Sequence, residues 1–128
     1  MALRLVPGLI GVFFLMQAIG WLIDPQSAAR ALGMPLLDGL GRSTQIGDLS
    51  ALFLFFGAAP LVGAIRSDPR WLRPPAMLLA AAALMRALAW LLHDATFAGA
   101  FIAVELVTSA LLFLAAWRLE PSTGGAGD

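Results

Sequence analysis

The sequence predicts an all-α fold, a bundle of four transmembrane helices. Of its 128 residues, 60% are hydrophobic and only 12% are charged, with a mean hydropathy of +0.87. Soluble domains are about 45–50% apolar and about 25% charged. The apolar residues also gather in four runs, each about long enough to cross a bilayer core of roughly 30 Å at 1.5 Å per residue. We therefore expect a single four-helix membrane domain over residues 1–119.

The first span is expected at about residues 3–23, and Asp24-Pro25 ends it with a turn signal. Its apolar stretch is longer than the roughly 7–15 residues of a secretory signal peptide, so we read it as a membrane helix. A loop over residues 24–42 follows on the outer side. Pro25–Met34 is a candidate short amphipathic helix within it, although a simple connecting loop is the preferred interpretation. Gly39 and Gly41 are expected to break any helix there.

The second span is expected to begin at Ser43, a good N-cap residue, which places Asp48 in its second turn. A polar turn with three arginines precedes the third span, and a short turn after His93-Asp94 precedes the fourth. The last residues, 120–128, are polar and glycine-rich, and we predict that they are disordered. The three later spans are expected at about residues 43–65, 75–92 and 97–117.

The first and third spans resemble each other, which indicates an internal repeat. LMQAIGWL in the first span aligns with LMRALAWL in the third, so that Gln17 matches Arg86 and a tryptophan stays in register. The bundle would then consist of two tandem helical hairpins related by a pseudo-two-fold axis along the membrane normal.

The arginines predict the orientation of the chain. Five of them fall at the end of the bundle that holds both termini, and only Arg30 and Arg42 fall at the other end. The positive-inside rule therefore predicts cytoplasmic termini. Together with the heavy use of alanine, glycine and proline, this suggests a multi-pass protein of the bacterial inner (plasma) membrane.

Polar side chains inside the spans predict a functional site. A charge at the centre of a membrane helix costs about 2.5–3.5 kcal/mol on insertion scales, so it needs a partner. Counted at 1.5 Å per residue, one polar side chain from each span lies roughly 7–13 Å below the outer boundary of the membrane. In chain order these side chains are Gln17, Asp48, Arg86 and Glu105. Other polar or aromatic residues continue the same helix faces. The ligand-binding residues predicted for this polar layer are Gln17, Gln45, Asp48, Arg86, Trp90, Glu105 and Thr108.

The layer holds two carboxylates but one arginine. The second carboxylate should therefore protonate or find another partner. A protonatable carboxyl group beside a fixed arginine suits acid–base catalysis, for which Asp48, Glu105 and Arg86 are the candidates. It suits equally well the binding of the polar head of an amphipathic molecule.

Composition excludes several other functions. Eight acidic residues balance eight basic ones, and no basic run is present, so we expect no nucleic-acid binding. The chain has no cysteine and a single histidine, so we expect no disulfide and no metal site. We expect no cofactor.

Short motifs in the second, third and fourth spans suggest a family. The run Arg42-Ser43-x-x-x-Gly47-Asp48-Leu49 leads into ALFLFFG, and Arg86 and Glu105 follow in the later spans. This pattern resembles a family of small four-helix bacterial membrane proteins of unknown function, grouped with the DoxX-like proteins. The resemblance implies the four-helix fold and the importance of Arg42, Asp48, Arg86 and Glu105, and it adds Arg42 to the predicted ligand-binding residues. The quinone and redox chemistry linked to DoxX-like relatives is not carried over, because this chain has no cysteine.

The preferred hypothesis is a small integral membrane protein that binds an amphipathic small molecule, or a partner, in the polar layer of the outer half of the bundle. One alternative is a membrane enzyme acting on a lipid-soluble substrate such as an isoprenoid or a quinone. Another is a purely structural ion-pair cluster in an accessory subunit. The sequence leaves open whether the chain forms a homo-oligomer.

Overall fold

The computed structural model describes residues 2–121, and its secondary structure there is helical. Four of the helices are long and apolar enough to cross a membrane, so this is a multi-pass membrane protein with the predicted all-α fold. The predicted disorder of the C-terminal tail falls, from residue 122 onward, outside the described residues. The elements are α1 (Ala2–Ile23), α2 (Pro25–Ala31), α3 (Gly39–Arg66), the 3-10 turn η1 (Pro69–Trp71), α4 (Arg73–His93) and α5 (Gly99–Leu119).

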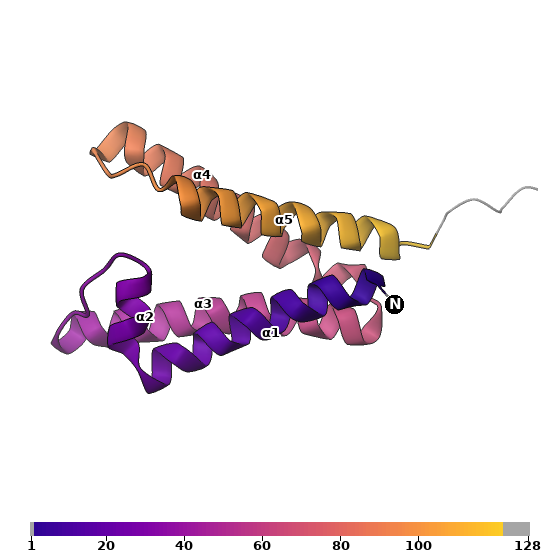
Figure 1. Ribbon diagram of the computed structural model, residues 1–128, viewed down its shortest axis with the longest axis horizontal. Helices are drawn as coiled ribbons and strands as arrows, with labels where there is room; N and C mark the ends of the chain where they lie inside the picture. Colours follow the sequence, from indigo (N-terminus) through magenta and orange to yellow (C-terminus); the bar gives the residue numbers. More distant parts are fainter. Residues whose placement is uncertain (1, 122–128) are drawn as a thin grey trace, which may run out of the picture.

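The four long helices form two hairpins. Helix α1 packs chiefly against α3, and α4 packs chiefly against α5. The hairpins meet where α1 begins, α5 ends and η1 lies, and we call this the closed end. They diverge toward α2 and the α4–α5 turn, which we call the open end (Figure 1). The predicted bundle of two tandem hairpins is therefore confirmed, whereas the pseudo-two-fold relation between the hairpins stays a prediction.

Two glycines let the backbones of α1 and α3 touch. A Cβ atom on Gly57 would lie 2.7 Å from the backbone nitrogen of Leu15 and 2.8 Å from the carbonyl oxygen of Gly11. A Cβ atom on Gly11 would in turn lie 2.7 Å from the carbonyl oxygen of Gly57. Such close approach is the usual role of small residues between membrane helices, where dispersion contacts replace the hydrophobic effect.

Small residues and one inserted leucine also hold the closed end together. Leu72, just before α4, is fully buried, and a Cβ atom on Gly63 of α3 would lie 2.6 Å from its Cδ2 atom. The hydroxyl of Ser109 donates a hydrogen bond of 2.7 Å to the carbonyl oxygen of Ala76, which ties α5 to α4. Arg73 and Glu120 form an ion pair that joins the start of α4 to the residue after α5.

The start of α3 differs from the prediction. The helix begins at Gly39 instead of Ser43, with Asp38 in the N-cap position, so neither Gly39 nor Gly41 breaks it. Gly39 takes a φ of +54°, which only glycine adopts easily, and this lets the chain turn into the helix. At 1.5 Å per residue the 28 residues of α3 span about 42 Å. Its polar first turns therefore extend beyond an apolar core of roughly 30 Å, and Asp48 lies in the third turn.

Other boundaries also differ from the prediction, and α4 begins at Arg73, two residues earlier than expected. Residues 24–42 are not a simple loop, because Pro25–Ala31 forms α2, although this helix is shorter than Pro25–Met34. The carboxylate of Asp24 accepts the backbone N–H of Ser27 at 3.2 Å and caps α2, with proline at its first position. Helix α5 begins at Gly99, two residues later than expected.

The glycine contact gives a stability prediction. Gly57→Ala should force α1 and α3 apart and lower the free energy of unfolding by about 1–3 kcal/mol, the usual cost of overpacking. Gly20→Ala is the matched control, because a Cβ atom there meets nothing within 4 Å and alanine favours the helix. Unfolding in mixed detergent followed by circular dichroism measures both. Equal stability of the two variants would contradict the backbone contact.

Candidate binding cavity

A cavity of about 290 Å³ lies between the two hairpins, and every helix of the described chain contributes to its wall. Its wall is mainly apolar and includes five phenylalanines. Three polar side chains interrupt that wall, one each from α1, α4 and α5. The lining residues are Phe13, Phe14, Gln17, Ala31, Leu32, Leu49, Leu52, Phe53, Phe56, Leu79, Ala82, Arg86, Phe101, Val104 and Glu105.

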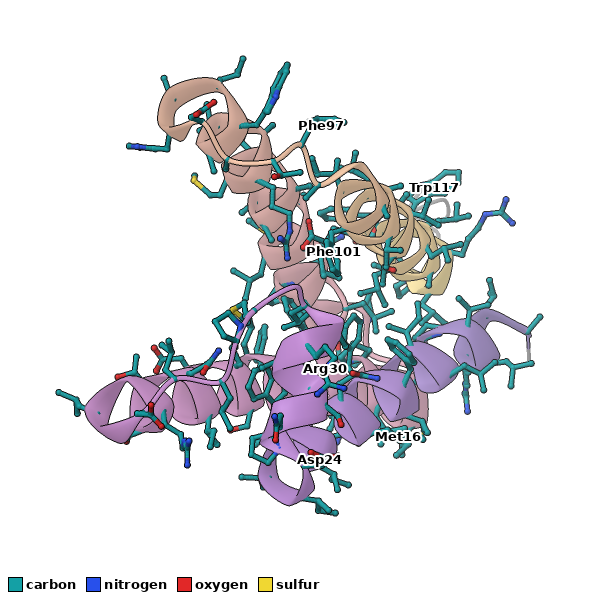
Figure 2. All side chains as sticks on the ribbon, turned by 60° about the vertical axis from the view of Figure 1, so that its left-hand side comes forward. Met16, Asp24, Arg30, Phe97, Phe101 and Trp117 are labelled. Carbon is teal, nitrogen blue, oxygen red and sulfur yellow. The ribbon has the colours of Figure 1, made fainter. Side chains whose placement is uncertain are left out.

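An ion pair crosses from α4 to α5 at the cavity wall. The Nε–H of Arg86 donates a hydrogen bond of 2.8 Å to Oε1 of Glu105. The Arg86 guanidinium also lies over the ring of Phe101, 4.8 Å from its centroid, in a cation–π contact. Phe101 lies between the helices of the second hairpin, whereas Trp117 points away from the molecule (Figure 2). The mid-span arginine thus has a carboxylate and an aromatic face as partners.

The ion pair leaves unused hydrogen-bonding capacity in two residues of the cavity wall. Oε2 of Glu105 is covered by neighbouring atoms and has no hydrogen-bond partner among the described residues. Over the same residues, the Nε–H bond to Glu105 is the one hydrogen bond that Arg86 makes, and the Gln17 amide makes none. A buried polar atom without a partner is costly, typically about 1–3 kcal/mol, so a group that satisfies it would bind favourably.

Asp48 does not lie with Arg86 and Glu105. Its side chain is exposed, it does not line the cavity, and it makes no ion pair within the described part of the chain. The reason is the face that it occupies, because Leu49, Leu52, Phe53 and Phe56 form the cavity face of α3 and Asp48 lies outside that set. Of the predicted polar layer, the structure brings together Gln17, Arg86 and Glu105.

Gln45 is buried but holds a loop instead of facing the cavity. Its Oε1 accepts the backbone N–H of Leu37 at 3.0 Å, and its Nε2 donates to the carbonyl oxygen of Pro35 at 3.1 Å. These bonds fasten the segment after α2 to the first turns of α3. Because Ala31 and Leu32 at the end of α2 line the cavity, Gln45 indirectly positions part of the cavity wall.

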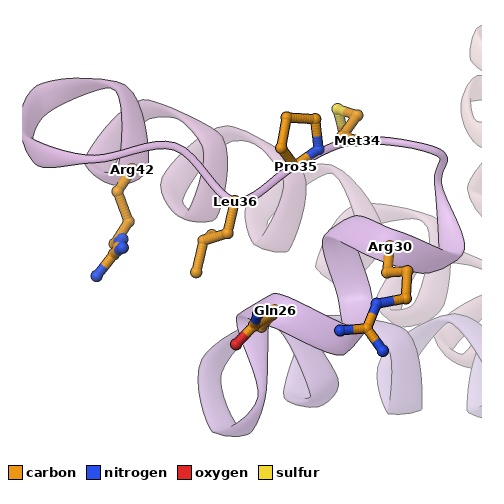
Figure 3. A pocket seen from close by; sticks show the side chains of 6 residues that line it. All are labelled: Gln26, Arg30, Met34, Pro35, Leu36 and Arg42. Carbon is orange, nitrogen blue, oxygen red and sulfur yellow. The ribbon is translucent and has the colours of Figure 1, made fainter.

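Arg42 lines a second, shallower pocket of about 310 Å³ at the open end, together with Gln26, Arg30, Met34, Pro35 and Leu36 (Figure 3). Its Nη2 pairs with Asp38 Oδ1 at 3.0 Å, and its Nε donates to the carbonyl oxygen of Leu37 at 2.8 Å. Hydrogen bonds from Ser27, assisted by the charge of Arg30, hold the pKa of Asp24 below its ordinary value. Both arginines of this pocket therefore have a carboxylate nearby.

The last two predicted residues also lie outside the cavity wall. Trp90 is exposed and packs edge-on against Phe97, with ring centroids 5.2 Å apart, which supports the α4–α5 turn. Thr108 is half-buried on α5 and does not line the cavity.

The apolar wall of the cavity is the part that sequence reasoning missed. Phe53 and Phe56 are three residues apart on α3, and Phe14 of α1 lies against both, with centroid distances of 5.9 and 5.3 Å. The i, i+3 spacing of two phenylalanines was available as a signal. It has little power in spans where almost every residue is apolar.

No family model, curated protein or solved structure matches the chain. The function is therefore inferred from the geometry of the cavity.

Gln45 gives a prediction about the loop. Gln45→Leu should free the backbone N–H of Leu37, so its hydrogen exchange should accelerate by about tenfold, the equivalent of one net hydrogen bond. Exchange of the α4 and α5 amides should not change. Gln26→Leu is the control, because Gln26 is exposed and makes no side-chain hydrogen bond within the described chain. Exchange that is equally fast in both variants would contradict the anchoring role.

Proposed function

We propose that this protein resides in the bacterial plasma membrane and binds an amphipathic small molecule in the cavity between its two hairpins. The observation that carries the proposal is the buried, unpartnered Oε2 atom of Glu105 at an otherwise mainly apolar cavity. Ligand pockets commonly combine such an apolar wall with a few convergent polar groups.

The cavity argues against a purely structural ion pair. A buried pair that only fixes helix packing is favourable when further hydrogen bonds satisfy its remaining atoms. Here one carboxylate oxygen lacks a partner, and a cavity of about 290 Å³ adjoins it. Both features are expected of an ion pair that binds a ligand.

The enzyme hypothesis uses Asp48 or Glu105 as acid or base, with Arg86 holding charge. Asp48 is exposed and does not line the cavity, so among the described residues Glu105 is the one carboxyl group in its wall. That carboxylate accepts a hydrogen bond of 2.8 Å from Arg86, which occupies the remaining candidate acid or base. Binding is therefore better supported than catalysis.

The exposed apolar side chains of the second hairpin favour entry from the lipid. Toward the open end, α4 and α5 separate from α1 and α3 (Figure 1). Large apolar side chains such as Leu84, Met85 and Val104 are exposed on α4 and α5. In a bilayer these side chains contact lipid, so an amphipathic molecule would enter sideways and bring its head to Arg86 and Glu105. The resemblance to DoxX-like proteins stays a proposal that rests on the sequence motifs.

Filling the cavity tests the proposal. Ala82→Leu adds bulk to a lining residue of α4 and should weaken saturable binding of decyl amphiphiles by about tenfold or more. Equilibrium binding to protein in phosphatidylcholine nanodiscs, minus partitioning into nanodiscs without protein, measures this. Ala81→Leu is the matched control, because Ala81 precedes Ala82 in the same helix but is exposed and does not line the cavity. No saturable binding in the unmodified protein would refute the proposal.

The proposed orientation has its own test. The chain has no cysteine, so single introduced cysteines report without background. In spheroplasts, a membrane-impermeant maleimide should label Ser27→Cys in α2 directly and label Trp71→Cys in η1 only after permeabilisation. The positive-inside rule gives this pattern, because the arginines concentrate at the closed end. The opposite labelling pattern would place the termini outside.

A further inference from the structure

We infer that the cavity selects a neutral amphiphile whose head carries a hydroxyl group, such as a long-chain alcohol, over an anionic or a cationic one. This inference rests on the proposed function and specifies the class of its ligand. It follows from the charge balance of the cavity and from the hydrogen-bonding atoms left free there.

The cavity is electrically balanced. Arg86 and Glu105 are the charged residues in its wall, and they are joined by a hydrogen bond of 2.8 Å. A guanidinium stays protonated in proteins, so the carboxylate beside it keeps the pair neutral overall. In a medium of low dielectric constant, a charged head group would lose its hydration without a net opposite charge to compensate it. The balance therefore favours a neutral head.

The free atoms require a head that both donates and accepts. The Glu105 carboxylate can only accept hydrogen bonds, and the remaining N–H groups of Arg86 can only donate. A hydroxyl group can donate to Glu105 and accept from Arg86 at the same time. A sulfate or phosphate ester accepts only and would place its charge beside the carboxylate. An ammonium donates only and would place its charge beside the guanidinium.

The wall suits an apolar chain behind that head. Phe14 packs against Phe53 and Phe56 on the first hairpin, and Phe101 lies beneath the guanidinium on the second. These rings offer no further hydrogen-bonding group, so the body of the ligand should be hydrocarbon. The amide of Gln17 also lines the cavity and can both donate and accept, so it can hydrogen-bond a second oxygen on the head.

Three probes with the same chain test the selectivity. Saturable binding of 1-decanol, decyl sulfate and decylammonium is measured on the full chain in phosphatidylcholine nanodiscs, with partitioning into empty nanodiscs subtracted. Decanol should bind about tenfold or more tightly than either charged probe, the discrimination expected from hydrogen bonds to charged groups. Tighter binding of decyl sulfate or decylammonium would overturn the inference while leaving the proposed function standing. No saturable binding of any probe would refute both.

Charge-altering variants provide the second measurement. Glu105→Gln leaves Arg86 uncompensated and should shift the preference toward decyl sulfate by about tenfold or more. Arg86→Gln leaves the carboxylate and should shift it toward decylammonium by a similar factor. The double variant Arg86→Gln/Glu105→Gln contains no buried charge to destabilise the fold and should still prefer decanol. Unchanged preferences in both single variants, checked for folding by circular dichroism, would place the head elsewhere and overturn the inference.

Discussion

The close packing of small residues at the closed end determines the shape of this bundle. In a membrane, helices gain little from hydrophobic burial against one another, so they associate where their surfaces fit closely. Gly11 and Gly57 allow the first hairpin to do so, and Gly63 receives Leu72 where the chain passes to the second hairpin. The two hairpins share one buried apolar cluster, which contains Phe14 and Phe56 of the first and Leu79 and Leu112 of the second. The cavity lies between the hairpins where this packing leaves space unfilled.

The ion pair lies within one hairpin. Arg86 and Glu105 join α4 to α5 and do not bridge the two hairpins. The hairpins can therefore differ in separation without breaking the pair. Both side chains line the cavity, and Phe101 lies against the guanidinium. Oε2 of Glu105 is covered by neighbouring atoms and has no hydrogen-bond partner among the described residues, so a ligand would reach it only after the carboxylate turns.

Much of the fold was predictable because membrane helices need long apolar runs, and these runs are visible in the sequence. The helix ends were harder, since an apolar run shows where hydrocarbon begins and not where helical hydrogen bonding stops. Helix α3 begins at Gly39, four residues before the expected start, and its first turn includes Gly39 and Gly41. The hydrogen bonds that Gln45 and Arg42 make with the backbone of Leu37 support those turns, and they depend on the path of the irregular segment before α3, which has no periodic sequence pattern.

The direction in which a side chain points explains which part of the site was predictable. Depth counted along a helix does not say which face of the helix a residue occupies. Arg86 and Glu105 share both depth and face, and they pair. Leu49 of α3 lines the cavity, but its neighbour Asp48, the apparent second carboxylate of the site, is exposed on another face. Because Asp48 does not belong to the site, the cavity is neutral and not net negative as the sequence predicted. This difference changes the class of ligand that the cavity can hold.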